Sequence, residues 1–266
     1  MKAMIFAAGL GTRLRPLTDS QPKALVEVGG VPALQRVLER IREAGIRDVV
    51  VNVHHFPEKI RAFLRENSDF GLNIAISDES ARLLDTGGGL LAALPLLGDD
   101  EPVVLHNADI VSDFSIGEMI AAYNQSSPDA LLLTADRPSS RRLLFDDNGD
   151  MRGWRNMTSG ETRPAALTAS DAMQLTPLAF GGAHIVAPGL FPHLRDYGAR
   201  NGDVFSITPF YIEACQRLTI KIVYASWRIS VARHRVDGKT ARSRLCIPSL
   251  KRAFGTAEFV NVKAIC

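Results

Sequence analysis

The sequence contains few cysteines and no long apolar run. Among its 266 residues are three cysteines, Cys215, Cys246 and Cys266, whose spacing fits neither a disulfide framework nor a zinc site. No hydrophobic stretch approaches the roughly 20 residues that cross a bilayer, and the N-terminus has no signal-peptide core. We therefore expect a cytoplasmic protein with no membrane partner.

A strong excess of charge is also absent. The formal net charge is +2, and 46% of the residues are hydrophobic and 23% charged, which is ordinary for a globular protein. This balance gives no reason to expect a nucleic-acid partner. The length fits one large domain or two small ones, and a homo-oligomer is compatible with the sequence.

Short apolar segments alternate with amphipathic ones along the first half of the chain. Strands are predicted at 3–8, 48–53, 72–76 and 102–105, and helices at 31–44, 57–67 and 89–97. The second half predicts helices at 115–123 and 207–218, strands at 130–135, 178–186 and 220–225, and a hairpin of 142–145 with 151–155. Such alternation predicts a three-layer, Rossmann-like α/β/α fold with a mixed, mostly parallel sheet.

The most informative segment follows the first predicted strand. Residues 7–23 read AAGLGTRLRPLTDSQPK. Gly9 and Gly11 let a ligand approach the main chain, and the amides of such a turn form a cradle for phosphate oxygens. Arg13 adds a planar cation and Lys23 a compact one. The segment is neither a dinucleotide fingerprint nor a Walker loop, since it lacks the third glycine and the Gly-Lys-Ser/Thr ending.

Two further segments carry candidate chemistry. Asp109, in Asn107-Ala108-Asp109, follows a predicted strand, and this places it at the same sheet edge as the first glycine segment. Its carboxylate is a candidate ligand for Mg²⁺, whereas Asn107 either binds a sugar hydroxyl or caps the turn. Residues 84–90, LDTGGGL, predict a second glycine turn, which either brings its main chain against a ligand or only makes room at the start of the following helix; Asp85 is a candidate cap of that helix.

The string Gly-x-Gly-Thr-Arg-Leu-x-Pro-Leu-Thr, followed by Pro-Lys-x-Leu, closely resembles the signature of sugar-1-phosphate nucleotidyltransferases. The resemblance runs from residue 1 to about 225, and residues 52–56, 83–89 and 143–147 look most similar to the short bacterial members. These use N-acetylmuramate 1-phosphate or mannose 1-phosphate. The resemblance implies a glycosyltransferase-A-like fold and Mg²⁺-dependent transfer of a nucleotidyl group from a nucleoside triphosphate, UTP or GTP, to a sugar 1-phosphate.

The same resemblance implies a set of site residues. The nucleotide would contact Ala7, Ala8, Gly9, Gly11, Thr12, Arg13, Lys23 and Gly87. Among these, Arg13 would hold the leaving phosphates and Lys23 would stabilise the phosphoryl group in transfer, while Asp109 would hold Mg²⁺. The sugar would contact Asn107, Asn156, Gly182 and Asp203; Asp203 could instead cap the helix at 207. Relatives use a lysine near residue 155 for the sugar phosphate, and here Arg155 or Asn156 would share that role.

The sequence departs from the family pattern after residue 226. Relatives carry a second metal-binding aspartate in a Trp-x-Asp-x-Gly context, whereas Trp227 is followed here by Arg-Ile-Ser-Val. Residues 227–266 also carry a net charge of +7 and two of the three cysteines. We therefore divide the chain into a nucleotidyltransferase domain, 1–226, and an atypical basic tail, 227–266.

Two hypotheses explain this tail. A slip of the reading frame is one, because a shifted reading of suitable codons gives Asp-Ile-Gly-Ser-Pro-Ala, which is similar to the missing motif. The other is a genuine basic extension that binds RNA or an anionic surface. If the tail is native, the alternative function is a nucleotide-binding relative that has lost catalysis together with its second carboxylate.

Overall fold

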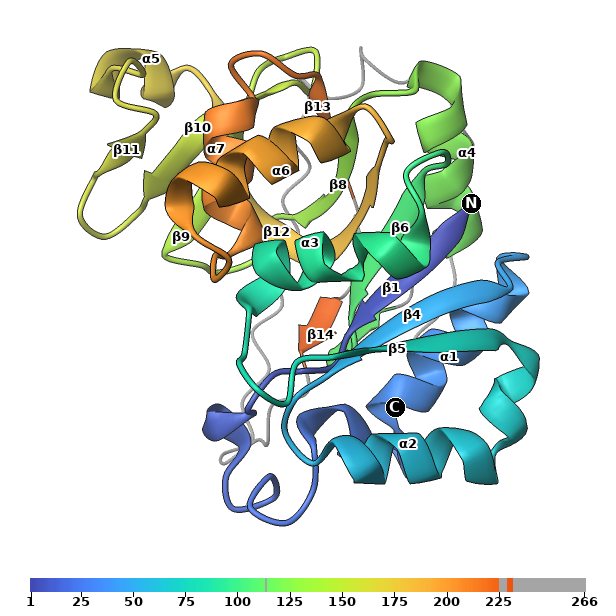
Figure 1. Ribbon diagram of the computed structural model, residues 1–266. Helices are drawn as coiled ribbons and strands as arrows, with labels where there is room; N and C mark the ends of the chain where they lie inside the picture. Colours follow the sequence, from blue (N-terminus) through green and yellow to red (C-terminus); the bar gives the residue numbers. More distant parts are fainter. Residues whose placement is uncertain (113, 225–228, 232–266) are drawn as a thin grey trace, which may run out of the picture.

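A mixed sheet of ten strands runs through the computed structural model, which describes residues 1–112, 114–224 and 229–231 (Figure 1). The main path has the order β11-β10-β9-β12-β6-β1-β4-β5, and β8 joins it through β12 and carries β13 on its other side. The strands are β1 Lys2–Phe6, β4 Asp48–Val53, β5 Asn73–Asp78, β6 Val103–Asn107, β8 Ala130–Ala135, β9 Arg141–Phe145, β10 Met151–Asn156, β11 Thr162–Arg163, β12 Thr176–Val186 and β13 Ile220–Tyr224. Two short pairs stand apart: β2 Glu27–Val28 with β3 Val31–Pro32, and β7 Ile110–Ser112 with β14 Ile229–Val231.

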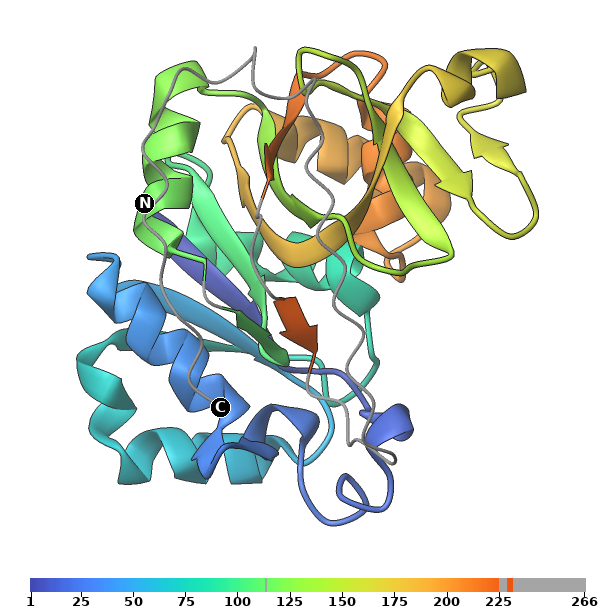
Figure 2. The same cartoon turned by 180° about the vertical axis from the view of Figure 1, so that it is seen from behind.

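Helices cover both faces of this sheet (Figures 1 and 2). They are α1 Ala33–Glu43, α2 Pro57–Glu66, α3 Asp85–Leu97, α4 Ile116–Ser126, α5 Ala169–Met173, α6 Leu190–Asn201 and α7 Ile207–Ala214, with 3₁₀ turns η1 Thr12–Leu14, η2 Lys23–Leu25 and η3 Ser68–Gly71. One core packs α1, α2 and α4 against the sheet, and a second packs α3, α6 and α7 against its other face. The predicted three-layer α/β/α architecture is confirmed.

The first core follows directly from the sequence pattern of α1. Leu34, Val37, Leu38 and Ile41 recur at helical spacing, and all four side chains are buried against the sheet. Gly45, in the left-handed conformation, follows the end of this helix. The β-branched run of β4 lies between β1 and β5 and is buried on both faces.

The direction of the strands changes at β12. β6, β1, β4 and β5 run parallel to one another, whereas β12 runs antiparallel to β6, β8 and β9. The carboxyl ends of β1, β4 and β6 therefore share a sheet edge with the amino-terminal half of β12. Ligands of open α/β sheets bind at such an edge.

Strand β12 contains an irregularity where it passes this edge. Its register against β8 shifts between Phe180 and His184, and Gly182 has a φ of 78°. A Cβ at Gly182 would lie 2.9 Å from Nδ2 of Asn107. Gly182 thus allows a close approach, because β12 packs against the end of β6 here.

Several elements differ from the sequence-based expectations. The predicted glycine turn at 84–90 is wrong, because α3 already begins at Asp85 and contains Gly87 to Gly89. Helix α6 was not predicted, and α7 ends at Ala214 rather than at residue 218. Apart from β14, the proposed tail 227–266 and the hypotheses about it lie outside the described residues. None of the helices in the described part has the length and hydropathy that crossing a membrane requires.

Candidate active site

The first glycine segment and Asp109 lie together at the edge of the sheet. The amide of Ala108 donates to the carbonyl of Phe6 at 3.1 Å, which ties the segment after β6 to the end of β1. Lys23, at the start of η2, forms an ion pair with Asp109, and the two side chains are only 22% and 16% exposed. The predicted neighbourhood of these two segments is therefore present, with a cation and a carboxylate in direct contact.

The amides of the first glycine segment fall into two groups. Those of Ala7 and Ala8 donate to Oδ1 of Asn52 at 2.7 and 3.2 Å. Those of residues 9–12 donate no hydrogen bond to any described residue. A phosphate group would therefore meet the amides of 9–12, whereas a nucleotide contact at Ala7 or Ala8 must use other atoms than their amide hydrogens.

Two glycines shape this turn in different ways. Gly11 has a φ of 65°, and a Cβ there would lie 2.8 Å from Cγ2 of Thr18. The hydroxyl of Thr18 also donates to the carbonyl of Gly11 at 2.9 Å, which fixes the turn. Gly9, in contrast, has open space where its side chain would be. Gly11 is thus required by the fold, and Gly9 leaves room on the side of a ligand.

Arg13 is exposed in η1 and forms no ion pair with a described residue. Its neighbour Arg15 lies near Asp19, with 3.4 Å between Nε and Oδ1. The guanidinium of Arg13 is consequently the cation of this turn that has no ion-pair partner among the described residues. A bidentate group of this kind suits a phosphate better than a point charge does.

A buried polar network lies beneath the turn and was not predicted from the sequence. Glu79 is 3% exposed, and its two oxygens accept hydrogen bonds from Nδ2 of Asn52 and from the amide of Leu84, at 2.7 and 3.0 Å. Through Asn52 this carboxylate supports the first glycine segment, and through Leu84 it supports the start of α3. The signal was an asparagine inside the otherwise apolar run of β4, because a buried amide requires partners.

The glycines of α3 lie against neighbouring protein segments and do not border an open cavity. A Cβ at Gly87 would lie 2.3 Å from the ring of Phe205, and one at Gly88 would lie 1.9 Å from the carbonyl oxygen of Asp203. The amides of both glycines donate to the carbonyl of Phe205, at 2.9 and 3.1 Å. The Gly87 amide is therefore already engaged, and a contact of this residue with the nucleotide stays a prediction.

Two capping assignments change in the structure. Leu84, rather than Asp85, occupies the N-cap position of α3, and Asp85 instead accepts from the amide of Thr86 at 2.6 Å. The amide of Ile207 at the start of α7 donates to the hydroxyl of Thr86 at 3.0 Å, so Asp203 does not cap that helix. Asp203 is exposed, and its contact with a sugar stays a prediction.

The predicted sugar-binding residues differ in whether their polar atoms already have hydrogen-bond partners in the protein. Asn107 lies against Gly182 at the sheet edge. The Oδ1 atom of Asn156 accepts from the amides of Thr158 and Ser159, at 2.9 and 3.2 Å, so this oxygen serves the turn after β10. Asn156 nevertheless lines a hollow of about 410 Å³ beside the N-terminal turn of α7. Arg155 does not line that hollow, and its Nε is buried without a partner among the described residues.

Two buried histidines flank this edge. Burial lowers the pKa of His106, next to Asn107, to about 4, and that of His184 in β12 to about 3. Both imidazoles are therefore neutral near pH 7. A third histidine, His54 after β4, places Nδ1 2.6 Å from the carbonyl oxygen of Glu79 and so contacts the main chain.

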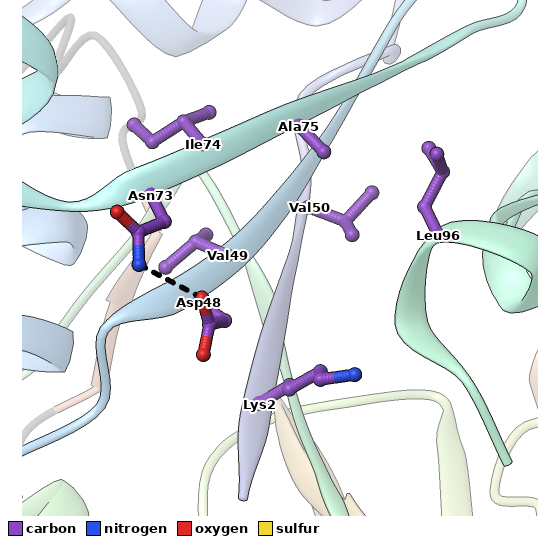
Figure 3. Close-up of a pocket in the computed structure, with 8 residues that line it drawn as sticks. All are labelled: Lys2, Asp48, Val49, Val50, Asn73, Ile74, Ala75 and Leu96. Carbon is purple, nitrogen blue, oxygen red and sulfur yellow. Dashed lines mark hydrogen bonds between the residues drawn. The ribbon is translucent and has the colours of Figure 1, made fainter.

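A second hollow, of about 330 Å³, lies at the opposite edge of the sheet (Figure 3). Its polar lining comes from Lys2, Asp48 and Asn73, which begin strands β1, β4 and β5. Asp48 there accepts a hydrogen bond from Nδ2 of Asn73 at 2.9 Å. Because it is at the amino ends of the strands, this hollow is separate from the glycine turn and Asp109.

Residues 2–142 match the model of the nucleotidyl transferase family. The N-acetylmuramate α-1-phosphate uridylyltransferase of Caulobacter vibrioides is 38% identical over 192 residues, which cover 70% of this chain and 75% of that protein. The chain belongs to the nucleotidyl transferase family. The predicted resemblance and reaction class, nucleotidyl transfer, are thereby confirmed.

Other members of the nucleotidyl transferase family align over shorter parts. The enzyme of the same name from Neisseria meningitidis is 42% identical over 127 residues, which cover 48% of this chain and 53% of that protein. A mannose-1-phosphate guanyltransferase of Gibberella zeae is 38% identical over 153 residues, which cover 56% of this chain and 42% of that protein. The chain thus spans about half the length of these two relatives.

Solved structures of nucleotidyl transferases show the same fold. A putative glucose-1-phosphate thymidylyltransferase from Bacillus anthracis aligns with a TM-score of 0.71 at 17% identity, covering 87% of this chain and 89% of that one. A UDP-glucose pyrophosphorylase in complex with UDP-glucose aligns with a TM-score of 0.67 at 19% identity, covering 86% and 92%. At these identities the likeness concerns the architecture alone, which agrees with the predicted nucleotidyltransferase fold.

Proposed function

We propose that this nucleotidyl transferase moves a uridylyl group from UTP to N-acetylmuramate 1-phosphate and releases pyrophosphate. Support for this donor and acceptor comes from two relatives with this activity in their names, at 38% and 42% identity. GTP with mannose 1-phosphate is the other pair that a relative suggests. The observation that carries the proposal is the ion pair of Lys23 with Asp109 beside the amides of residues 9–12, which donate to no described residue.

The reaction needs no nucleophile from the protein. An anionic oxygen of the sugar phosphate attacks the α-phosphorus of UTP, a P–O bond forms, and the bond to the bridging oxygen of pyrophosphate breaks. Such phosphoryl chemistry depends on positioning and on stabilising negative charge. The amides of residues 9–12 and the guanidinium of Arg13 would hold the departing phosphates, and Lys23 would stay close to the α-phosphoryl group.

The structure suggests how Lys23 and Asp109 change on binding. In the free protein their charges offset each other. A triphosphate brings several negative charges to the same turn and competes for the ammonium group of Lys23. As Lys23 turns to the phosphates, an oxygen of Asp109 becomes available to another cation.

Asp109 fits a Mg²⁺ site in which the protein supplies one carboxylate and the substrate phosphates supply further ligands. The described residues contain no group of three or more His, Cys, Asp or Glu side chains that could hold a metal alone. Mg²⁺ is commonly bound by one or two carboxylates together with phosphates and water. Asp109 would supply the carboxylate, and the ion would neutralise charge that develops on the transferred phosphoryl group.

The test is pyrophosphate release measured with UTP, GTP, CTP and dTTP against a panel of sugar 1-phosphates. We expect release that needs both substrates, with UTP and N-acetylmuramate 1-phosphate giving the highest kcat/KM. Arg13→Ala and Asp109→Asn are expected to lose most of that activity while they unfold at the wild-type temperature. Wild-type turnover in Arg13→Ala would contradict the role of that residue.

A second candidate function is nucleotide binding without turnover. It is favoured by the sequence Trp227-Arg228-Ile229, where the family pattern has an aspartate at the third position. The structure pairs Ile229 with Ser112 in β7, three residues after Asp109. If this alternative holds, UTP binds but no pyrophosphate is released, and Ile229→Asp raises both Mg²⁺ affinity and turnover. Equal Mg²⁺ affinity in the two chains would speak against a lost second ligand.

A further inference from the structure

The hollow of about 410 Å³ beside α7 has the composition of a small-molecule site. Its walls include Trp154 and Phe180, its polar groups include Ser206 and Thr208, and Arg141 stands among them. Sites for small ligands typically combine aromatic walls with a few polar groups that fix orientation. The hollow lies between the β9–β10–β12 part of the sheet and the start of α7.

The position of the hollow relates it to the proposed reaction centre. Phe180 of the hollow and Gly182 beside Asn107 are two residues apart on β12. On the other wall, the hydroxyl of Ser206 lies 3.5 Å from the hydroxyl of Thr86 in the first turn of α3. The hollow therefore adjoins the edge that carries Asp109, on the side away from the phosphate turn.

Arg141 is the charged residue of this hollow that is available to a ligand. Its side chain is exposed and makes no hydrogen bond or ion pair with a described residue. Arg163, on the same rim, is already bound to Glu161 at 2.8 Å and lies over the ring of Trp154 at 5.6 Å. The charge of Arg163 is offset by this carboxylate, whereas that of Arg141 is available to a ligand.

The backbone holds Arg141 in place although its side chain is free of partners among the described residues. Its amide donates to the hydroxyl of Ser139 at 3.2 Å, and the same hydroxyl donates to its carbonyl at 2.8 Å. In the sheet it pairs with Asn156, which also lines the hollow. A cation on a fixed strand end, beside apolar walls, suits an anionic group attached to a ligand that fills the hollow.

We propose that Arg141 binds the carboxylate of an acidic sugar and selects such sugars over neutral ones. This inference rests on the proposed function, since the sugar must place its anomeric phosphate near Asp109. N-acetylmuramate carries a lactyl ether with a carboxylate, where N-acetylglucosamine has a hydroxyl group. A guanidinium binds a carboxylate through two parallel hydrogen bonds, and the aromatic walls would pack against the ring and the lactyl methyl group.

Calorimetric binding of sugar 1-phosphates to the full chain tests this inference without requiring turnover. Binding of N-acetylmuramate 1-phosphate, its methyl ester and N-acetylglucosamine 1-phosphate is measured with Mg²⁺ and a non-hydrolysable UTP analogue present. The ester keeps the size of the lactyl group but removes its charge. The variants are Arg141→Gln and, as a matched control on the same hairpin, Arg152→Gln, whose guanidinium is bound to Asp146 outside the hollow.

We expect the wild type to bind the free acid about tenfold more tightly than the ester or the neutral sugar. This is the contribution of one charge-assisted pair at an exposed position. Arg141→Gln should remove this preference and leave the neutral sugar unchanged, and Arg152→Gln should keep it.

Three other outcomes are decisive. Equal losses for acid and neutral sugar in Arg141→Gln would mean that Arg141 binds the phosphate, and they would overturn the inference. Equal binding of acid and neutral sugar by the wild type would overturn it as well, although the proposed function would stand. If neither sugar phosphate binds the wild type, the proposed function itself fails.

Discussion

Oδ1 of Asn52 accepts a hydrogen bond from the amide of Ala7 at 2.7 Å, and Nδ2 of Asn52 donates one to Oε1 of Glu79 at the same distance. Both side chains are almost fully buried. The first glycine segment is therefore supported by one buried asparagine, which accepts from two main-chain amides and donates to one carboxylate. This arrangement fixes the turn before any ligand arrives, so little ordering is left for binding to supply.

Replacing Asn52 is expected to affect both folding and nucleotide binding. Asn52→Leu leaves two buried amides and an oxygen of Glu79 without partners, and each such group costs about 1–3 kcal/mol. We expect the free energy of unfolding to fall by roughly 3 kcal/mol and UTP binding to weaken, as measured by urea denaturation and calorimetry. Asn73→Ala removes a comparable asparagine contact on the surface and serves as the control. Unchanged UTP binding by a folded Asn52→Leu chain would exclude the supporting role.

The Lys23–Asp109 ion pair should contribute more to turnover than to stability. Because both side chains are partly exposed, Lys23→Met is expected to lower the free energy of unfolding by no more than about 1 kcal/mol. Loss of a group that stabilises the transferred phosphoryl should lower kcat by about a hundredfold or more. Lys221→Met is a matched control, because Lys221 forms an ion pair of similar exposure with Asp150 at 2.7 Å. A parallel loss of kcat in both variants would contradict a specific role for Lys23.

The buried histidines predict a loss of stability in acid. The pKa of His184 in the folded chain is about 3, below the 6.5 of an unfolded histidine, because burial disfavours its charged form. Unfolding therefore takes up a proton below pH 6.5. The contribution of His184 to the free energy of unfolding is complete above pH 6.5 and is lost as the pH falls. At pH 5 the loss is about 2 kcal/mol for such a group.

Denaturation of His184→Phe at pH 7 and pH 5 checks this expectation. The variant should lose about 2 kcal/mol less than the wild type between the two pH values, since a phenyl ring cannot titrate. The exposed His193 provides the control, and His193→Gln should show the wild-type difference. An identical pH dependence in all three chains would exclude His184 as a source of acid instability.

Two glycine-to-alanine substitutions should separate packing from ligand binding. Gly88→Ala would place a methyl group 1.9 Å from the carbonyl oxygen of Asp203, so α3 or the segment before α7 must move. We expect a loss of roughly 2–4 kcal/mol, within the range of strong overpacking. Gly9→Ala meets no protein atom within 4 Å and should unfold normally but bind UTP about tenfold more weakly. Thermal denaturation and calorimetry decide both cases, and normal UTP binding by Gly9→Ala would place the phosphates elsewhere.

Much of the sheet and of the site could be predicted because local patterns determined them. The apolar runs at 48–53 and 130–135 form β4 and β8 with the predicted bounds. The meeting of the glycine turn with Asp109 followed from the rule that parallel strands end at one edge. These features depend on residues close in the sequence, or on the direction of the strands.

The remaining features depend on contacts between distant segments. Glycine disfavours helices, so three in succession predicted a turn, yet close packing of Phe205 and Asp203 against α3 overrides that preference. Helix α6 contains Pro192 and Gly198, which obscured its helical period. The pairing of Asn52 with Glu79 joins two segments distant in the sequence, and nothing in the periodicity of either encodes it.

A single strand, β12, reaches from the reaction edge to the hollow with Arg141. Between its ladder to β9, at residues 176–178, and its ladder to β6, at residues 183–186, it passes through Gly182, whose φ is 78°. The distance between the proposed phosphate position and Arg141 is thus set by the backbone conformation at this glycine. A sugar whose acidic arm differs in length from the lactyl ether would need another conformation of Gly182 to bind at both places.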